Sequence, residues 1–158
     1  DLLLERSRGR GGSSLSAWPE HSNVSMSTIS VALSRRLAET HAKAGRAYVS
    51  APVFGRPDAA AAAKLFIVTA GPSEAIERCR PLFDALGQKT FVVGPDAPAA
   101  NVVKLAGNFL IASVLESLGE ALALIRKSGI DPARFLDFLT SSLFTAPVYK
   151  TYGAIIVQ

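Results

Sequence analysis

A lysine and two asparagines stand at helical spacing within an apolar stretch of the chain. Asn101, Lys104 and Asn108 follow one another at intervals of three and four residues, which places the three side chains on one face of a helix. Their neighbours, among them Val102 and Val103, are apolar, so this face is expected to be at least partly buried. A lysine there either extends its ammonium into water along an apolar flank or is held away from water for chemistry.

A desolvated amine near the start of a helix is suited to proton transfer. Burial and the positive end of the helix dipole both disfavour the ammonium form, and they move the pKa of such an amine from about 10.4 toward neutrality. Such an amine suits the acceptance of a proton from a reacting group and its return to that group. We therefore interpret Lys104 as a candidate general acid/base, with a snorkelling surface lysine as the alternative.

Length and composition limit the class of protein. The chain has 158 residues and 49% hydrophobic content, enough for one domain or slightly more with a sizeable core. The formal charge of +4 is mild and forms no stripe on a predicted folded face, so no nucleic-acid partner is expected. The single cysteine, Cys79, excludes an internal disulfide, and neither histidine has metal-ligand spacing, so no metal site is predicted.

The N-terminal residues and the apolar runs bear on location. No uninterrupted apolar stretch reaches the length needed to cross a bilayer, and the first residues lack the basic-then-apolar order of a signal peptide. We expect a cytoplasmic protein without a membrane partner. Residues 1–21 combine arginine, glycine and serine without periodicity, which predicts an irregular tail.

Residues 22–97 alternate between segments typical of strands and segments typical of helices. This rhythm predicts an α/β fold whose strands are parallel and whose crossovers are right-handed. The expected strands lie near residues 23–26, 46–53, 65–70 and 90–93, and the expected helices near 31–44 and 74–86, with a helical turn at 59–63.

Residues 98–158 have a helical pattern. From about Ala99 to Ser128 there is no proline, and thirty residues of helix would be about 45 Å long. Apolar residues go most of the way around this helix, so more than one of its faces must be covered by protein. Asp131 and Pro132 begin a further helix that ends near Thr140, and residues 146–152 are interpreted as a connection. We predict a long linking helix and the start of an all-helical domain.

Three segments in register resemble the β-hydroxyacid dehydrogenase family, which includes 3-hydroxyisobutyrate and 6-phosphogluconate dehydrogenases. They are the sequences SMSTIS at residues 25–30, YVSAPVFG at 48–55 and NVVKLAGN at 101–108, and the resemblance covers about residues 23–152. It implies a Rossmann-type domain that binds NAD or NADP, and a long helix that leads to an all-helical, dimerising domain. The implied reaction is hydride transfer between nicotinamide and a small hydroxy acid.

The resemblance assigns roles to individual residues. Thr28, with Ser27 beside it, matches the Ser/Thr that contacts the cofactor near its nicotinamide end. Lys104 matches the catalytic lysine, and Asn108 matches the asparagine that helps to hold substrate and lysine. The residues expected to bind substrate are Phe54, Gly55 and Arg56.

The substrate segment departs from the family pattern, which commonly has Ser-Gly-Gly at this point. Phe54 replaces a hydroxyl with an aromatic wall, and Arg56 either forms a bidentate clamp on a carboxylate or is a solvated surface side chain. A ketone or an imine therefore joins the hydroxy acid as an expected substrate class.

The cofactor half of the resemblance is incomplete. No strand–GxGxxG–helix turn occurs in the chain, although the family uses one to bind the pyrophosphate. The chain is thus expected to be the second part of a Rossmann-type sheet, truncated at both ends, with doubtful dinucleotide binding and impaired activity when isolated. The alternative from a different class is a non-catalytic remnant or dimerisation module that uses its long apolar helix to pair.

Overall fold

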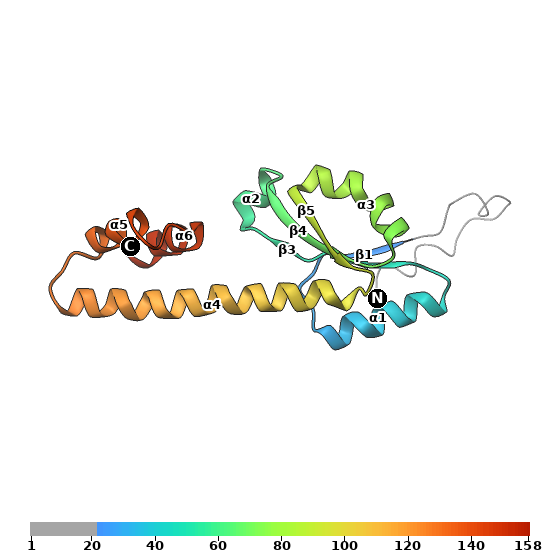
Figure 1. Ribbon diagram of the computed structural model, residues 1–158, viewed down its shortest axis with the longest axis horizontal. Coiled ribbons are helices and arrows are strands. Elements are labelled where there is room, and N and C mark those ends of the chain that lie inside the picture. Colours follow the sequence, from blue (N-terminus) through green and yellow to red (C-terminus); the bar gives the residue numbers. More distant parts are fainter. Residues whose placement is uncertain (1–21) are drawn as a thin grey trace, which may run out of the picture.

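The computed structural model describes residues 22–158, so the tail predicted for residues 1–21 lies outside the described residues. Five strands and six helices follow one another within the described part (Figure 1). In chain order they are β1 (Asn23–Ser25), α1 (Val31–Lys43), β2 (Tyr48–Ser50), β3 (Val53–Phe54), α2 (Pro57–Ala61), β4 (Leu65–Ala70), α3 (Ser73–Leu86), β5 (Gly87–Gly94), α4 (Pro98–Lys127), α5 (Pro132–Ser141) and α6 (Pro147–Ile156).

The strands form one mixed sheet. Its order is β1-β2-β4-β3, and β5 also pairs with β4. The pairs β1–β2 and β4–β5 are parallel, as the predicted βαβ rhythm requires, whereas β4 is antiparallel to both β2 and β3. The α/β fold is confirmed, but the sheet is not parallel throughout. Residues 55–64 between β3 and β4 are too few for a crossover, which needs a dozen or more residues, so the chain returns antiparallel.

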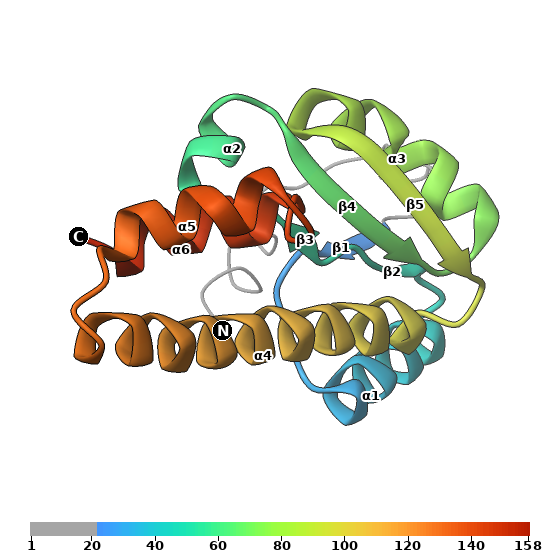
Figure 2. The same ribbon diagram turned by 60° about the vertical axis from the view of Figure 1, so that its left-hand side comes forward.

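Helices cover both faces of the sheet. Helix α3 packs on one face, and α1 and α4 pack on the other (Figures 1 and 2). Strand β4 shows why, because its side chains alternate between the faces. Leu65 and Ile67 belong to a core cluster with Phe83 of α3, and Val68 and Ala70 belong to a second cluster that includes residues of α4.

Helix α4 carries the chain beyond the sheet to α5 and α6 (Figure 1). Leu118 and Leu122 of α4 form a third cluster with Leu139 of α5. The predicted start of α5 is confirmed, since the Asp131 carboxylate accepts a hydrogen bond of 2.9 Å from the backbone N–H of Ala133. The fold therefore has the long helix followed by further helices that the sequence predicts.

Residues 146–152 were interpreted as a connection, and this was wrong. They begin α6, with Pro147 at its first turn. Gly153 explains how α6 packs, because a Cβ at this position would lie within 3.1 Å of a Leu136 methyl group. The two helices thus approach closely, and α6 is brought back toward the sheet (Figure 2).

Helix α4 corrects the expectation that no apolar segment is long enough to cross a bilayer. Among residues 22–158 it is the one helix that is long and apolar enough to cross a bilayer by length and composition, with a mean hydropathy of 1.5 over its most apolar window. Its first turns pack on the sheet, and its second half packs on α5 and α6. These contacts are those of a helix that joins two packed parts of a protein.

Candidate active site

Asn101 anchors the first turns of α4 to the sheet. Its side chain is fully buried, and its Oδ1 accepts a hydrogen bond of 2.7 Å from the Ser50 hydroxyl of β2. Its Nδ2 donates to the carbonyl oxygen of Ile29, at 3.5 Å, in the loop between β1 and α1. One amide thus ties α4 to β2 and to the loop that carries Ser27 and Thr28.

Lys104 lies one turn further along the same face and is buried, with only 9% of its surface exposed. Burial lowers the pKa of its amine. The Nζ atom lies 3.9 Å from the centroid of the Phe54 ring. This placement favours a desolvated amine over a lysine that extends along an exposed flank.

Lys104 and Asn108 line a common pocket of about 350 Å³. Its walls come from the end of β3 and the turn after it, from the middle of α4, and from α6. The lining residues are Phe54, Gly55, Arg56, Lys104, Asn108, Ile111, Ala112, Leu115 and Tyr152. The structure therefore brings together both predicted catalytic residues and all three predicted substrate residues. Their roles stay predictions.

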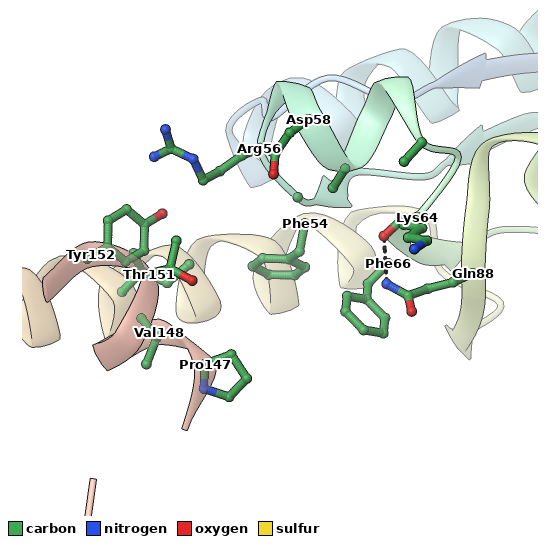
Figure 3. A pocket seen from close by; sticks show the side chains of 14 residues that line it. Phe54, Arg56, Asp58, Lys64, Phe66, Gln88, Pro147, Val148, Thr151 and Tyr152 are labelled. Atoms are coloured by element: carbon green, nitrogen blue, oxygen red, sulfur yellow. Dashed lines mark hydrogen bonds between the residues drawn. The ribbon is translucent and has the colours of Figure 1, made fainter. Parts of the chain in front are cut away.

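Gly55 and Arg56 shape the mouth of this pocket. Gly55 has a φ of 147°, a conformation that favours glycine, and a Cβ there would come within 3.2 Å of Ala59. The chain can therefore turn sharply out of β3. Arg56 is exposed, and its guanidinium carbon lies 5.9 Å from the centroid of the Tyr152 ring, above α6 (Figure 3).

Ser27 and Thr28 do not line the pocket. Both are exposed in the loop that follows β1, close to the Ile29 carbonyl that Asn101 contacts. This loop lies at the carboxyl end of β1, which is parallel to β2. In open α/β sheets, dinucleotides bind outside the carboxyl ends of such strands. The loop thus fits the predicted cofactor contact.

A second cavity of about 610 Å³ lies beside the pocket and shares five of its lining residues, including Phe54 and Tyr152. It separates α6 from the edge formed by α2 and β4, and Phe66, Pro147 and Val148 give it an apolar lining (Figure 3). At its far end, the Gln88 side chain donates a hydrogen bond of 2.7 Å to the carbonyl oxygen of Lys64.

The sequence does not predict four of the lining residues, which are Ile111, Ala112 and Leu115 of α4 and Tyr152 of α6. Tyr152 is the one of these that comes from an element the sequence analysis did not predict. The interpretation of residues 146–152 as a connection concealed it. Pro147 at a helix start, followed by apolar residues at Val148, Tyr152 and Ile156 with a spacing of four, is the signal that was available. Among residues 22–158, no group of three or more His, Cys, Asp or Glu side chains is placed to hold a metal ion.

Replacing Asn101 with alanine is expected to lower the free energy of unfolding by about 1–3 kcal/mol. The variant leaves the Ser50 hydroxyl without its partner in a site closed to water. Urea unfolding of the wild type, Asn101→Ala, Ser50→Ala and the double variant gives the four free energies of unfolding of a double-mutant cycle. We expect a coupling energy above about 0.5 kcal/mol. Strict additivity of the two single variants would show that the contact contributes nothing.

The fold and the pocket together define a class of protein. An α/β part, β1 to β5 with their helices, is joined by the long helix α4 to a helical part, α5 and α6. The buried Lys104 lies where the two parts meet on α4. A family model described as the NAD binding domain of 6-phosphogluconate dehydrogenase matches residues 11–94, just over half of the 158 residues. The chain belongs to this family. The resemblance to the β-hydroxyacid dehydrogenases is thereby confirmed, and nicotinamide dinucleotides are the cofactor class of the family.

Individual relatives agree with this assignment. The uncharacterized oxidoreductase YfjR of Bacillus subtilis is 47% identical over 136 residues, which are 86% of this chain and 47% of that protein. The 3-hydroxyisobutyrate dehydrogenase of Pseudomonas aeruginosa is 34% identical over 119 residues, which are 75% of this chain and 40% of that protein. The chain spans about half the length of the curated relatives it matches.

A solved structure shares the arrangement as well. The 3-hydroxyisobutyrate dehydrogenase of Mycobacterium tuberculosis, whose structure was determined with L-serine, superposes with a TM-score of 0.74 at 27% identity. The match covers 84% of this chain and 45% of that one.

Proposed function

We propose that this chain belongs to an NAD(P)-dependent oxidoreductase that interconverts a hydroxy acid and its carbonyl form, or reduces a related imine. The observation that carries the proposal is the buried Lys104 amine, which shares a pocket with Asn108 at the junction of the sheet and the helical part. Among residues 22–158 no carboxylate forms an ion pair with this lysine or lines its pocket, and a buried lysine of this kind is costly. Such groups cluster at functional sites.

In the proposed reaction, the nicotinamide supplies or accepts the hydride when it is bound. In the direction of reduction, the Lys104 ammonium donates a proton to the substrate oxygen as negative charge develops there, and the amine then recovers a proton from solvent. In the direction of oxidation, the neutral amine accepts the hydroxyl proton. Asn108, one turn away on the same face, holds the substrate oxygen and the amine in register.

The lining of the pocket supports an acid with an apolar body as the substrate. Arg56 at the mouth supplies the one full positive charge besides Lys104 among the lining residues, and it suits a carboxylate. Phe54, Ile111 and Leu115 give the pocket an apolar wall. The relatives named for 3-hydroxyisobutyrate point to the same class of small hydroxy acids.

For the cofactor, we propose contact with Ser27 and Thr28 in the exposed loop after β1. We also propose that the isolated chain binds dinucleotide weakly, because no GxGxxG turn occurs in it. A separate proposal is that the protein acts in the cytoplasm.

The experiment is a turnover assay with the protein produced from its complete gene. Consumption of NADH and of NADPH is followed at 340 nm with a panel of small keto acids, semialdehydes and cyclic imines. The proposal predicts oxidation of one of the two cofactors with at least one member of the panel. Failure of every pair, in a protein that circular dichroism shows to be folded, counts against it.

We further propose that the active form is a homodimer, and the surface of α4 favours this. Val102, Leu105 and Phe109 form an apolar row, with 51%, 40% and 69% of their surfaces exposed. A second copy of the chain is a suitable cover for a row of this kind. The same surface favours the alternative function, a dimerisation module without catalysis, which would pair without any dependence on cofactor.

Replacing Phe109 with glutamate is expected to shift the protein from dimer to monomer, because each copy would place a charge in the apolar interface. Sedimentation equilibrium measures the change, and a dimer constant at least tenfold weaker is expected. Leu143→Glu is the matched control, since Leu143 is 90% exposed and lies outside the row. Equal sedimentation of the wild type and Phe109→Glu would reject this interface.

A further inference from the structure

We propose that Phe54 is a positioning residue for Lys104, through a ring that rests on the α4 backbone at Gly107 and holds the amine by a cation–π contact. The proposal rests on the proposed function for its catalytic meaning, but the contact itself stands on geometry.

Gly107 leaves the space that the Phe54 ring occupies against helix α4. A Cβ built at this position would lie 2.6 Å from Cε1 of Phe54, closer than real Cβ atoms approach another side chain. The ring therefore lies directly against the helix backbone. Glycine inside a helix costs about 1 kcal/mol relative to alanine. Its presence at 107 is explained by the space that the Phe54 ring needs.

The amine of Lys104 lies over the same ring. Lys104 is three residues before Gly107, so the two positions are neighbours on one face of α4 and a single ring reaches both. The Nζ atom of Lys104 lies 3.9 Å from the ring centroid, within the range of a cation–π contact. Because Phe54 is fixed against Gly107, it fixes the end of the lysine side chain in turn.

The charges of the other lining residues determine which groups favour the charged form of the amine. Of the other residues that line the pocket, Arg56 carries a positive charge and Tyr152 a phenol, and no carboxylate is among them. The electron-rich face of Phe54, which the Nζ atom contacts directly, favours the charged form of the amine electrostatically. It offsets part of the effect of burial, which acts in the opposite direction on the pKa of Lys104.

The two effects together suit a proton donor that is reloaded at each turnover. Burial disfavours the charged form of the amine, whereas the ring favours it and holds it at one point of the pocket wall. The family pattern places a serine hydroxyl at position 54. In this chain, therefore, position 54 acts on the catalytic amine as well as on the substrate.

Fluorination of the ring tests the proposal with only a small change in the size of the ring. Phe54 is replaced by 4-fluoro-, 3,5-difluoro- and pentafluorophenylalanine, which weaken and then reverse the negative potential of the ring face. The pKa of Lys104 is read by NMR from ε-¹³C-lysine, and the resonance is assigned by its loss in Lys104→Met. We expect the pKa to fall stepwise, by about one over the whole series. A pKa that does not change along the series overturns the proposal.

Phe91 gives a matched control and Gly107 a second variant. Lys89 lies 4.9 Å from the centroid of Phe91, but both side chains are exposed, so fluorination of Phe91 is expected to leave the pKa of Lys89 nearly unchanged. Gly107→Ala displaces the Phe54 ring and is expected to broaden or shift the Lys104 resonance. A resonance identical to that of the wild type overturns the proposal.

The NMR readout separates this proposal from the proposed function. If the pKa of Lys104 follows the fluorination series while no substrate is turned over, the contact stands and the catalytic assignment fails. If turnover is present and the pKa does not respond, the catalytic assignment stands and the role given to Phe54 fails.

Discussion

Lys104→Met is expected to lower kcat/KM by about 10²–10⁴, the range of general acid/base catalysis, while cofactor affinity stays within a factor of two or so. Methionine keeps the length and the apolar volume of the side chain but has no proton to transfer. It also retains the packing against Phe54. The change therefore removes the chemistry from the pocket and leaves its shape. Steady-state kinetics and calorimetric titration with the cofactor measure the two quantities in the protein produced from its complete gene.

Lys89→Met is the matched control for this prediction. Lys89 also lies over an aromatic ring, that of Phe91, but it is exposed on β5 and does not line the pocket. Its replacement is expected to change kcat/KM by less than about twofold. If Lys104→Met turned over substrate as fast as the Lys89 variant, Lys104 would not be the general acid/base.

Phe83→Ala is expected to lower the free energy of unfolding by about 3–5 kcal/mol, the largest stability effect that we predict. Phe83 is 1% exposed and belongs to the cluster between α3 and the sheet. Removing its ring leaves a cavity that surrounding side chains fill only in part. Urea unfolding monitored by circular dichroism measures the change.

Leu82→Ala is the control on the same helix, because Leu82 is 46% exposed and its loss opens no cavity. We expect it to change the free energy of unfolding by less than about 1 kcal/mol. Equal losses in the two variants would show that α3 does not pack through Phe83. The pocket lies on the other side of the sheet, so the folded fraction of Phe83→Ala should keep its kcat.

Much of the fold could be predicted from local signals. The run from Leu65 to Ala70 is short, apolar and followed by a glycine, and it is strand β4 with these bounds. The proline-free stretch after Pro98 is the single helix α4. In both cases propensity, periodicity and breaker residues agree, so local preference and tertiary structure have the same outcome.

The mixed sheet could not be predicted in the same way. Strand β4 returns antiparallel to β3 because few residues separate Phe54 from Leu65 and because the chain turns sharply at Gly55. The alternation of predicted strands and helices does not contain this information. Helix α6 was not predicted, because the short segment that contains Pro147 was interpreted as a connection.

The candidate site was predictable where residues are near in sequence, and less so where they meet only in space. The spacing of Asn101, Lys104 and Asn108 was sufficient to place them on one face. The packing of Phe54 on Gly107, more than fifty residues apart, and the arrival of Tyr152 from α6 are tertiary contacts that no local pattern specifies.

The most direct test of the account is transfer of deuterium from [4,4-²H₂]-labelled NADH or NADPH to substrate, compared between the wild type and Lys104→Met. The label is followed by mass spectrometry of the product from the best substrate in the panel. We predict that the wild type places deuterium on the carbon that bears the new hydroxyl or amine, and that the variant does so at least a hundredfold more slowly. Absence of label in the wild-type product, or equal rates for the two proteins, would contradict Lys104 as the acid/base of a hydride transfer.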